Sequence, residues 1–271
     1  MDTLEFLYHT AAGRALLKPL VSRGVSRLAG KLLDTGASRC LIDSFVRRAG
    51  IDTADYDLTD IHSFNDFFCR PLKRGRRSMD MDPDALIAPC DGLLTAVPIR
   101  NDTVLHVKQS RWSMSRMLGD AALSAEFEGG VCLVFRLSVD NYHRYIYFDS
   151  GEKGKNVFLP GALHTVRPVA LEEVPVLAEN CREYTVIDAD SFGRSVQAEI
   201  GAMLVGRIVN NEPGPARVRR GEEKGRFEYG GSTILLLLRR DAARLRDDIR
   251  FASDKGIETP VKLGERIGTK A

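Results

Sequence analysis

The chain has 271 residues, enough for one large domain or two small ones, and its 44% hydrophobic and 28% charged residues are typical of a globular protein with a real core. The net charge of +2 argues against a strongly basic nucleic-acid-binding protein. Five cysteines without a CxxC pair favour buried free thiols in a reducing compartment over disulfides or a zinc site.

The ends and the apolar runs of the chain bear on its location. The N-terminus carries Asp2 and Glu5 and lacks the positive region of a signal peptide. The longest purely aliphatic run, Ile234–Leu238, is far too short to span a bilayer. We therefore expect an intracellular protein whose contact with a membrane is peripheral.

Residues 3–50 are expected to be helical, because apolar residues such as Leu4, Leu7 and Ala11 recur at helical spacing. Residues 1–50 hold eight Lys or Arg and four acids, a net charge of +4. A basic amphipathic segment can lie on an anionic membrane surface, but these helices can equally cap the rest of the protein. Three glycines are expected to divide the segment into short helices: Gly24, Gly30 and Gly36.

From residue 88 onward, short runs of β-forming residues alternate with Gly, Pro and Asp. The expected strands lie within residues 93–99, 103–108, 131–137, 142–148, 183–188, 196–209 and 232–240. We expect a short helix around Arg111–Leu118 and a polar tail, residues 241–271, that wraps the surface. The pattern predicts an α+β fold, with N-terminal amphipathic helices in residues 1–62 and a β-rich domain in residues 63–271.

The most apolar of these strands begins in an unusual way. Gly230, Gly231 and Ser232 precede the aliphatic run Ile234–Leu238. Glycine weakens a strand unless a bulge, a bend or a close backbone approach is needed. The motif therefore indicates either a bend at the start of the strand or a reactive peptide bond between Gly231 and Ser232.

Four polar residues lie between apolar runs where packing alone would not require them. Asp91 precedes a glycine just ahead of a strand, His143 lies in an aromatic strand, His164 lies between two prolines, and Ser232 follows two glycines. Each has an ordinary structural explanation, since Asp-Gly is a common turn and a lone histidine in a strand is more often structural than catalytic. Asp, His and Ser are also the parts of a nucleophilic triad, whose order along the chain is free.

Taken together, the motifs are more specific than any one of them. In order they are "FNDFFCRPLKRGRR" (64–77), "APCDG" (88–92), "LSVDNYHRYIYFDSG" (137–151), "GALHTVRPVAL" (161–171), "NCREYTVI" (180–187), "EIGAMLVGRIV" (199–209), "GEEKGRFEYGGST" (221–233) and "LGERIG" (263–268). This set resembles the phosphatidylserine decarboxylase family over residues 64–268. The N-terminal helices are much less distinctive.

The resemblance implies that the chain cuts itself. In that family the serine hydroxyl attacks the preceding carbonyl, an ester replaces the amide, and elimination and loss of ammonia leave a pyruvoyl group. Mapped here, cleavage falls between Gly231 and Ser232 and gives a large chain, residues 1–231, and a small chain, residues 232–271, that stay associated. A side chain at position 231 would crowd the attack and resist the strained backbone, which accounts for the glycine.

The resemblance also implies the reaction and its setting. The pyruvoyl carbonyl forms a Schiff base with the serine amine of phosphatidylserine and accepts the electrons left by carbon dioxide, giving phosphatidylethanolamine for phospholipid biosynthesis. It implies no external cofactor, metal or nucleic acid. We expect the enzyme at the cytoplasmic face of an anionic membrane, and the basic run at residues 70–77 to be a solvated face that can meet lipid headgroups.

The sequence departs from the family at one position of the self-cleavage relay. The family uses an Asp–His–Ser relay, and Asp91 and Ser232 match two of its members. Many relatives carry HxxH in the aromatic strand, where the first histidine is linked to decarboxylation and the second to the relay; here these positions hold His143 and Ile146. Isoleucine cannot move a proton, and positions three apart in a strand point oppositely. The hypothesis from the sequence is that His164 is the relay base and His143 serves decarboxylation.

Two other classes of function compete with this one. A lipid-binding protein that has lost catalysis is supported only by Ile146. A serine hydrolase using Ser232 is disfavoured, because the chain lacks the GxSxG elbow of that class. The sequence leaves open the oligomeric state, the depth of membrane association and the lipid preference.

Overall fold

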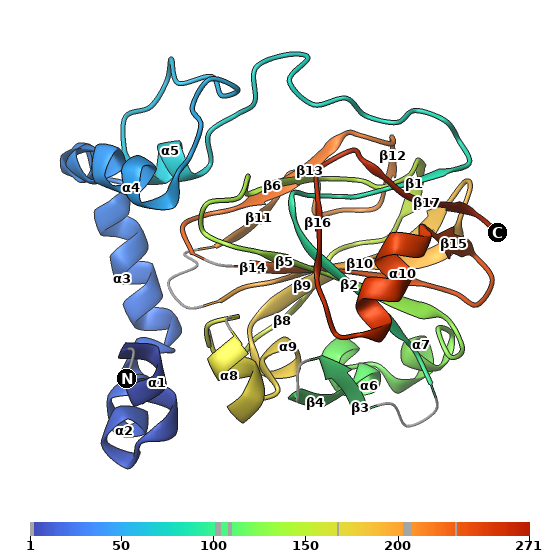
Figure 1. The fold of residues 1–271 in the computed structure, drawn as a ribbon, viewed down its shortest axis with the longest axis horizontal. Helices are drawn as coiled ribbons and strands as arrows, with labels where there is room; N and C mark the ends of the chain where they lie inside the picture. Colours follow the sequence, from blue (N-terminus) through green and yellow to red (C-terminus); the bar gives the residue numbers. More distant parts are fainter. Residues whose placement is uncertain (1–2, 101–103, 108–109, 167, 203–206, 231) are drawn as a thin grey trace.

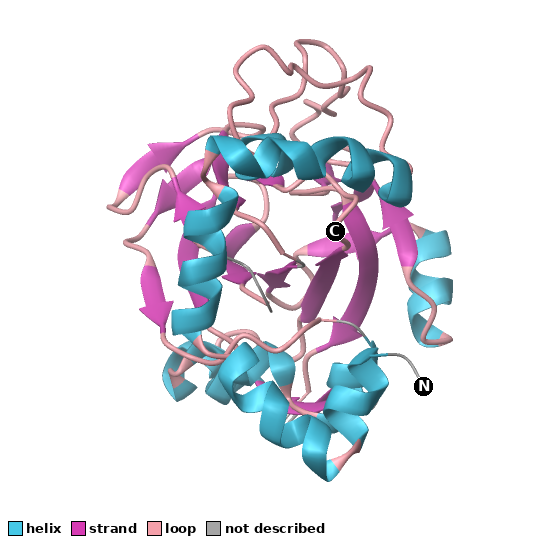
Figure 2. Ribbon diagram, turned by 90° about the vertical axis from the view of Figure 1, so that its left-hand side faces the viewer, coloured by secondary structure: helices cyan, strands magenta, loops and turns pink. Residues whose placement is uncertain are grey.

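The computed structural model describes residues 3–100, 104–107, 110–166, 168–202, 207–230 and 232–271. The N-terminal helices line one side of a strand-rich body, and the view from that side shows them in front of and around the strands (Figures 1 and 2). In the part of the chain that is described, no helix has the length and apolar character needed to cross a membrane.

The helices precede the strands in the chain and recur between them. They are α1 (Thr3–His9), α2 (Ala11–Leu20), α3 (Arg23–Leu33), the 3-10 helix η1 (Gly36–Leu41), α4 (Ile42–Ala49), α5 (Phe64–Phe68), α6 (Met114–Leu118), α7 (Ala121–Ala125), α8 (Pro168–Glu173), α9 (Val176–Glu179) and α10 (Asp247–Asp254).

Caps, rather than glycines, set the boundaries of the first helices. The side chains of Thr10 and Ser22 accept hydrogen bonds from backbone N–H groups in the first turns of α2 and α3. Helix α3 runs without interruption through Gly24 and Gly30, so the prediction of breaks at these two glycines is wrong. The third, Gly36, does begin η1.

A large antiparallel sheet forms the centre of the body. Its strand order is β12 (Ala216–Val218), β7 (Gly151–Lys153), β9 (Arg182–Ala189), β10 (Gly193–Ile200), β14 (Ser232–Leu238), β5 (Val131–Leu137), β2 (Gly92–Pro98) and β16 (Thr259–Val261), with β8 (Val157–Leu159) also paired to β9. The α+β prediction is confirmed.

Three smaller sheets complete the strands. They are β1 (Ala85–Ile87), β17 (Arg266–Lys270) and β15 (Ala243–Leu245); β11 (Ile208–Asn210), β13 (Glu223–Phe227) and β6 (Arg144–Ile146); and the pair β3 (Val104–Val107) and β4 (Ser110–Ser113).

Two sequence predictions need correction. The helix expected around Arg111–Leu118 begins only at Met114, because the preceding residues form β4 and Ser113 caps the helix. The C-terminal tail, residues 241–271, does not only wrap the surface. It adds β16 to the central sheet and β17 to a smaller one, and it buries Ile249 and Ile267 in the core.

Strand β14 is buried on both faces, which explains its continuous aliphatic sequence. Leu235 and Leu237 pack in one core with helix α6, while Ile234 and Leu236 pack in a second core with β6 and β1. Side chains alternate along a strand, so Ser232 lies on the same face as Ile234, toward the core that contains β6.

The N-terminal helices are joined to the body by direct contacts. The amide of Leu163 donates to the carbonyl of Val21 at 3.0 Å. On α4, the Phe45 ring lies 5.1 Å from that of Phe64 on α5. The domain boundary after residue 62 stays a prediction.

A buried ion pair joins the central sheet to the small sheet formed by β11, β13 and β6. Lys224 on β13 donates to Glu199 on β10 at 2.7 Å, and neither side chain is exposed to solvent. The ammonium also donates to the Asn210 side chain at 3.0 Å. Burial raises the pKa of Glu199, and the charge of Lys224 opposes that rise. Removal of the lysine alone would leave a buried carboxylate without its counterion.

We therefore expect Lys224→Met to lower the free energy of unfolding by about 3–5 kcal/mol, measured by urea denaturation. The measurement is made in a Ser232→Ala background so that one uncut chain is compared with another. Adding Glu199→Leu should recover most of the loss, because no charge is then stranded. Arg250→Gln, which removes an exposed ion pair with Asp247, should have little effect. Equal effects of the lysine and arginine changes would contradict this account.

Candidate active site

Ser232 is the first residue of β14 and has no solvent exposure. It pairs with Leu137 of β5. Its hydroxyl oxygen has no hydrogen-bond partner among the described residues. A buried hydroxyl without a partner is costly, so this one is a candidate for a functional role.

The backbone just before Ser232 has a glycine-specific conformation. Gly230 has φ of 132°, a region that residues with a side chain rarely adopt. This supports the predicted bend at the start of the strand. The predicted requirement for glycine at position 231 lies outside the described residues.

The "FNDFF" motif of α5 holds this segment from the side. The side chain of Asn65 accepts a hydrogen bond from the amide of Tyr229 at 3.0 Å and donates to Asp34 at 2.8 Å. The Phe68 ring lies 5.1 Å from the Tyr229 ring and 4.1 Å from the imidazole of His143. The motif therefore positions both the chain before Ser232 and the histidine.

His143 is buried, and its tautomer follows from its contacts. Nδ1 lies 2.9 Å from the carbonyl oxygen of Asn141, which can only accept, so Nδ1 carries the proton. Nε2 therefore has a free lone pair, and it has no partner among the described residues. Burial lowers the pKa of His143 to about 3, which keeps the ring neutral at physiological pH.

A strand pairing and a short turn lead from Ser232 to His143. Leu137, the strand partner of Ser232, is followed by a turn in which the amide of Ser138 donates to the Asn141 side chain at 2.8 Å. His143 follows this turn and precedes β6, so it is not part of the regular strand that the sequence predicted. The argument from strand alternation therefore does not apply to it. His143 therefore lies six residues along the chain from Leu137, and its ring contacts Phe68, which also contacts Tyr229, three residues before Ser232.

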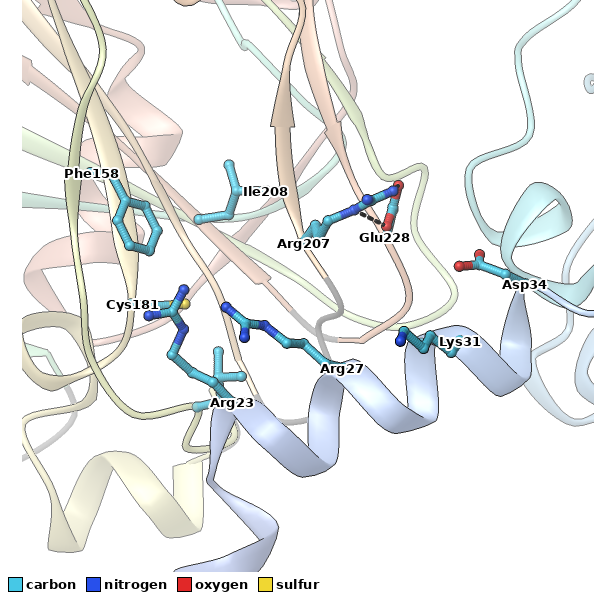
Figure 3. A pocket seen from close by; sticks show the side chains of 11 residues that line it. Arg23, Arg27, Lys31, Asp34, Phe158, Cys181, Arg207, Ile208 and Glu228 are labelled. Atoms are coloured by element: carbon cyan, nitrogen blue, oxygen red, sulfur yellow. Dashed lines mark hydrogen bonds and ion pairs between the residues drawn. The ribbon is translucent and has the colours of Figure 1, made fainter.

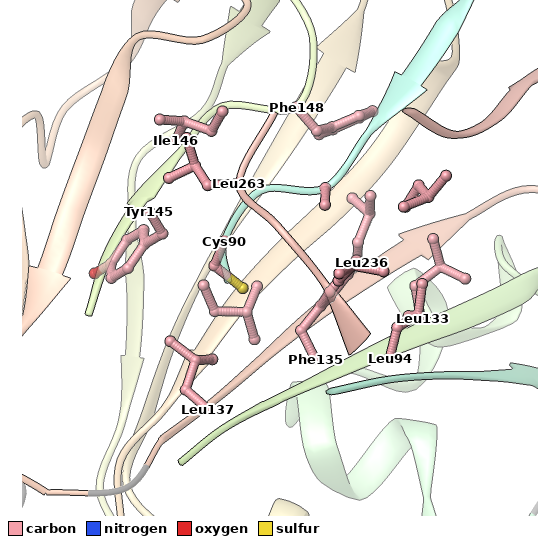
Figure 4. Close-up of a cluster of buried hydrophobic side chains, with 14 of the residues drawn as sticks. Cys90, Leu94, Leu133, Phe135, Leu137, Tyr145, Ile146, Phe148, Leu236 and Leu263 are labelled. Carbon is pink, nitrogen blue, oxygen red and sulfur yellow. The ribbon is translucent and has the colours of Figure 1, made fainter. Parts of the chain in front are cut away.

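Ile146, at the position where many relatives carry histidine, is part of the apolar core. Figure 4 shows it with Tyr145, Cys90 and Leu263. Its amide donates to the carbonyl of Pro89 at 2.9 Å. The side chain fills space in this core and offers no proton-transfer group.

Asp91 is buried and bound by cations rather than by a histidine in the described structure. Its carboxylate accepts from Arg77 at 3.1 Å and from the Leu263 amide at 2.8 Å, and Lys262 lies 3.6 Å away. Asp91 also lines a pocket together with Asn141, which lies two residues before His143 in the chain. Its assignment as the relay aspartate stays a prediction.

Part of the basic run at residues 70–77 is structural, contrary to its prediction as a solvated face. Arg70 is fully buried, with its guanidinium carbon 4.1 Å from the centre of the Tyr56 ring. Arg77 is occupied by Asp91. The remaining basic residues of the run are exposed: Lys73, Arg74 and Arg76.

His164, the relay base suggested by the sequence, contacts the N-terminal helices. Its Nδ1 lies 3.2 Å from the hydroxyl of Tyr8 on α1, and its amide donates to Asn180 at 2.9 Å. Burial lowers the pKa of His164. These contacts join it to neither Asp91 nor Ser232, so its role in the relay stays a prediction without support from this geometry.

A pocket of about 380 Å³ opens between α3 and the strands (Figure 3). Arg23, Arg27 and Lys31 line it from the helix, and Glu228 lines it from the segment that leads to Ser232. Sequence reasoning treated these basic residues only as part of an amphipathic face. Their spacing of four residues indicates that they share one face of a helix, and it could have revealed this group from the sequence.

Comparison with known proteins shows the family of this chain. Residues 64–269 match the family model described as phosphatidylserine decarboxylase. The match covers all of the motifs that build the Ser232 and His143 environment.

Named relatives are similar over nearly the whole chain. A phosphatidylserine decarboxylase proenzyme 2 from Clostridium acetobutylicum is 39% identical over 267 residues, 98% of this chain and 91% of that protein. Phosphatidylserine decarboxylase proenzymes from Ruminiclostridium cellulolyticum and Clostridium perfringens are 38% and 34% identical, over 98% of this chain and 90% and 92% of their own lengths. The chain therefore belongs to the phosphatidylserine decarboxylase family.

Proposed function

We propose that this enzyme decarboxylates phosphatidylserine to phosphatidylethanolamine with a pyruvoyl group that it makes from Ser232 by self-cleavage. The relatives' names supply the substrate and the word proenzyme. The observation that carries the proposal is the pair of buried, unpartnered groups, the Ser232 hydroxyl and Nε2 of His143.

In the proposed self-cleavage, the Ser232 oxygen attacks the carbonyl carbon of Gly231, and the peptide C–N bond breaks to leave an ester and a free amine. Nε2 of His143 takes the hydroxyl proton and returns it to the departing nitrogen. Elimination releases the large chain as a carboxylate and leaves dehydroalanine at position 232. Addition of water and loss of ammonia then convert that residue to the pyruvoyl group.

This assignment differs from the hypothesis that His164 is the base. The neutral imidazole of His143 offers a free lone pair, and its ring contacts Phe68, which also contacts Tyr229 just before Ser232, while His164 contacts Tyr8. We assign His143 to the decarboxylation step as well, since cleavage leaves its imidazole unchanged. Asp91, paired with Arg77, fixes the segment before β2 and lines a pocket with the turn that leads to His143.

The surroundings of Ser232 fit a pyruvoyl group. Such a group supplies an electrophilic ketone that acts as an electron sink for loss of carbon dioxide. The site excludes bulk water, since Ser232 and Thr233 are buried. Strand β14 is paired on both sides, with β5 and β10, and residues 241–271 add further strands, so the small chain would stay bound after the cut.

Peripheral attachment to the cytoplasmic face of an anionic membrane is part of the proposal. The N-terminal helices contact the body, yet they expose large apolar side chains, including Leu16, Leu28 and Leu32. Basic residues alternate with these leucines along the chain. Apolar side chains beside cations are the features by which a helix binds an anionic lipid surface.

The direct test supplies vesicles of phosphatidylserine to the purified protein and measures carbon dioxide and phosphatidylethanolamine. We expect equal amounts of both products, and labelling of the small chain by a hydrazide that reacts with ketones. Binding to the vesicles without either product would contradict the proposal and favour a lipid-binding protein that lacks catalysis.

The low pKa of His143 predicts how self-cleavage depends on pH. A histidine with its ordinary pKa of about 6.5 would be only about 3% neutral at pH 5, so a rate that needs neutral imidazole would fall about thirtyfold from pH 8. The pKa of His143, about 3, keeps the ring neutral across this range. We therefore expect the rate of cleavage of freshly refolded precursor to change less than threefold between pH 8 and pH 5. A thirtyfold fall would contradict the assignment.

A further inference from the structure

The pocket beside α3 has a wall of three cations. Arg23, Arg27 and Lys31 are spaced four residues apart, so they lie on one face of the helix, and Figure 3 shows them along the pocket. The cavity measures about 380 Å³ and opens to the surface. It is large enough for a small polar headgroup.

These cations are not neutralised within the described residues. Arg27 and Lys31 make no ion pair there, and Arg23 places its guanidinium carbon 5.2 Å from the centre of the Phe158 ring. Arginines left without a carboxylate in a pocket can offer paired N–H donors to an anion.

The acids of the pocket do not cancel this charge. Glu228 is occupied by Arg207, which donates to both of its oxygens at 2.9 and 2.8 Å. Asp34 accepts from the Asn65 side chain. Four cations against two carboxylates leave the lining with two excess positive charges. Such a pocket attracts anions.

Two residues of the pocket lining are connected to the region of the reactive residue. Glu228 lies four residues before Ser232 in the chain. On the other side, the carbonyl of Cys181 accepts from the amide of Gly201, which directly follows the β10 residue paired with Thr233. Short stretches of chain therefore link two residues of the pocket lining, Glu228 and Cys181, to the start of the strand that begins at Ser232.

The outer part of α3 suits the rest of a lipid. Leu28 and Leu32 are 62% and 61% exposed, and each follows a pocket cation, Arg27 or Lys31, by one residue. One helix thus presents cations toward the pocket and apolar side chains on a neighbouring face. A phospholipid has the matching arrangement, with an anionic phosphate next to apolar acyl chains.

We infer that Arg23, Arg27 and Lys31 bind the phosphodiester of the phosphatidylserine headgroup and direct its serine amine toward position 232. This inference rests on the proposed function. It makes the three cations substrate-positioning residues and assigns the first step of substrate selection to the N-terminal helices.

The test compares Arg27→Gln with Lys18→Gln, which removes an exposed cation of α2 that does not line the pocket. Phosphatidylserine is supplied in micelles of a neutral detergent, and KM and kcat are measured separately. Arg27→Gln should raise KM about tenfold and leave kcat within about twofold, because it loses one charge-assisted contact made before the chemical step. Lys18→Gln should match the wild type. Equal changes in the two variants would overturn the inference, since general attraction to the surface would then explain them.

A soluble headgroup identifies the ligand independently of catalysis. Glycerophosphoserine should bind the uncut Ser232→Ala protein, measured by calorimetry, and bind about tenfold more weakly when Arg27→Gln is added. Inorganic phosphate should bind more weakly than the diester. Equal binding of the two compounds, or no effect of Arg27→Gln, would overturn the assignment. Because this measurement needs no turnover, its failure is distinct from a wild-type protein that forms no phosphatidylethanolamine.

Discussion

Ser232→Ala should remain a single chain of 271 residues and form no phosphatidylethanolamine. The change removes the one oxygen proposed to attack the Gly231 carbonyl, so neither the ester nor the pyruvoyl group can form. The fold should persist, because that oxygen has no hydrogen-bond partner among the described residues. Denaturing electrophoresis reports the cleavage, and release of carbon dioxide from phosphatidylserine vesicles reports the activity.

Ser195→Ala is the matched control. Ser195 is also a buried serine of the central sheet, but its hydroxyl donates to the carbonyl of Ile187 at 3.0 Å. Its removal should cost about 1 kcal/mol of stability and leave cleavage intact. If Ser232→Ala were cut normally, the position of the cleavage site would be wrong.

His143→Ala should slow self-cleavage by at least about a hundredfold, the usual contribution of a positioned general base. The uncut precursor should accumulate, because the variant lacks the unpartnered lone pair of Nε2 that we assign to the hydroxyl proton of Ser232. The half-time of cleavage after refolding is the quantity to measure. Substitution of the buried ring leaves a space of imidazole size, so imidazole present during refolding can be enclosed there and should restore part of the rate.

His164→Ala serves as the comparison and separates the two candidate bases. It removes a histidine that contacts Tyr8, and we expect near-normal cleavage. Blocked cleavage in this variant, together with normal cleavage in His143→Ala, would reverse the assignment and support the hypothesis drawn from the sequence. A folding control by circular dichroism shows whether either loss reflects an unfolded protein.

Much of the fold could be predicted because the sequence pattern is strong where burial is complete. The run Ile234–Leu238 indicated a buried strand, and it lies at the centre of the main sheet. The two glycines before Ser232 indicated a bend, and the positive φ of Gly230 explains the first of them. The motifs alone indicate the family, because they are specific in sequence as well as in structure.

The site itself depends on contacts that sequence spacing does not encode. The tautomer of His143 is set by a carbonyl, that of Asn141, and every residue has a carbonyl, so no side-chain pattern could reveal it. Arg70 and Arg77 looked like part of a solvated run, but an aromatic ring and a buried carboxylate bind them. The expected break at Gly24 failed because the Ser22 cap outweighs the low helix propensity of one glycine.

The central claim is tested most directly by the intact mass of the purified protein under denaturing conditions. The account predicts two species, residues 1–231 with an ordinary carboxylate and residues 232–271 lighter by one ammonia than their plain sequence. A single uncut chain of 271 residues would contradict it, as would a small chain that begins with an unmodified serine.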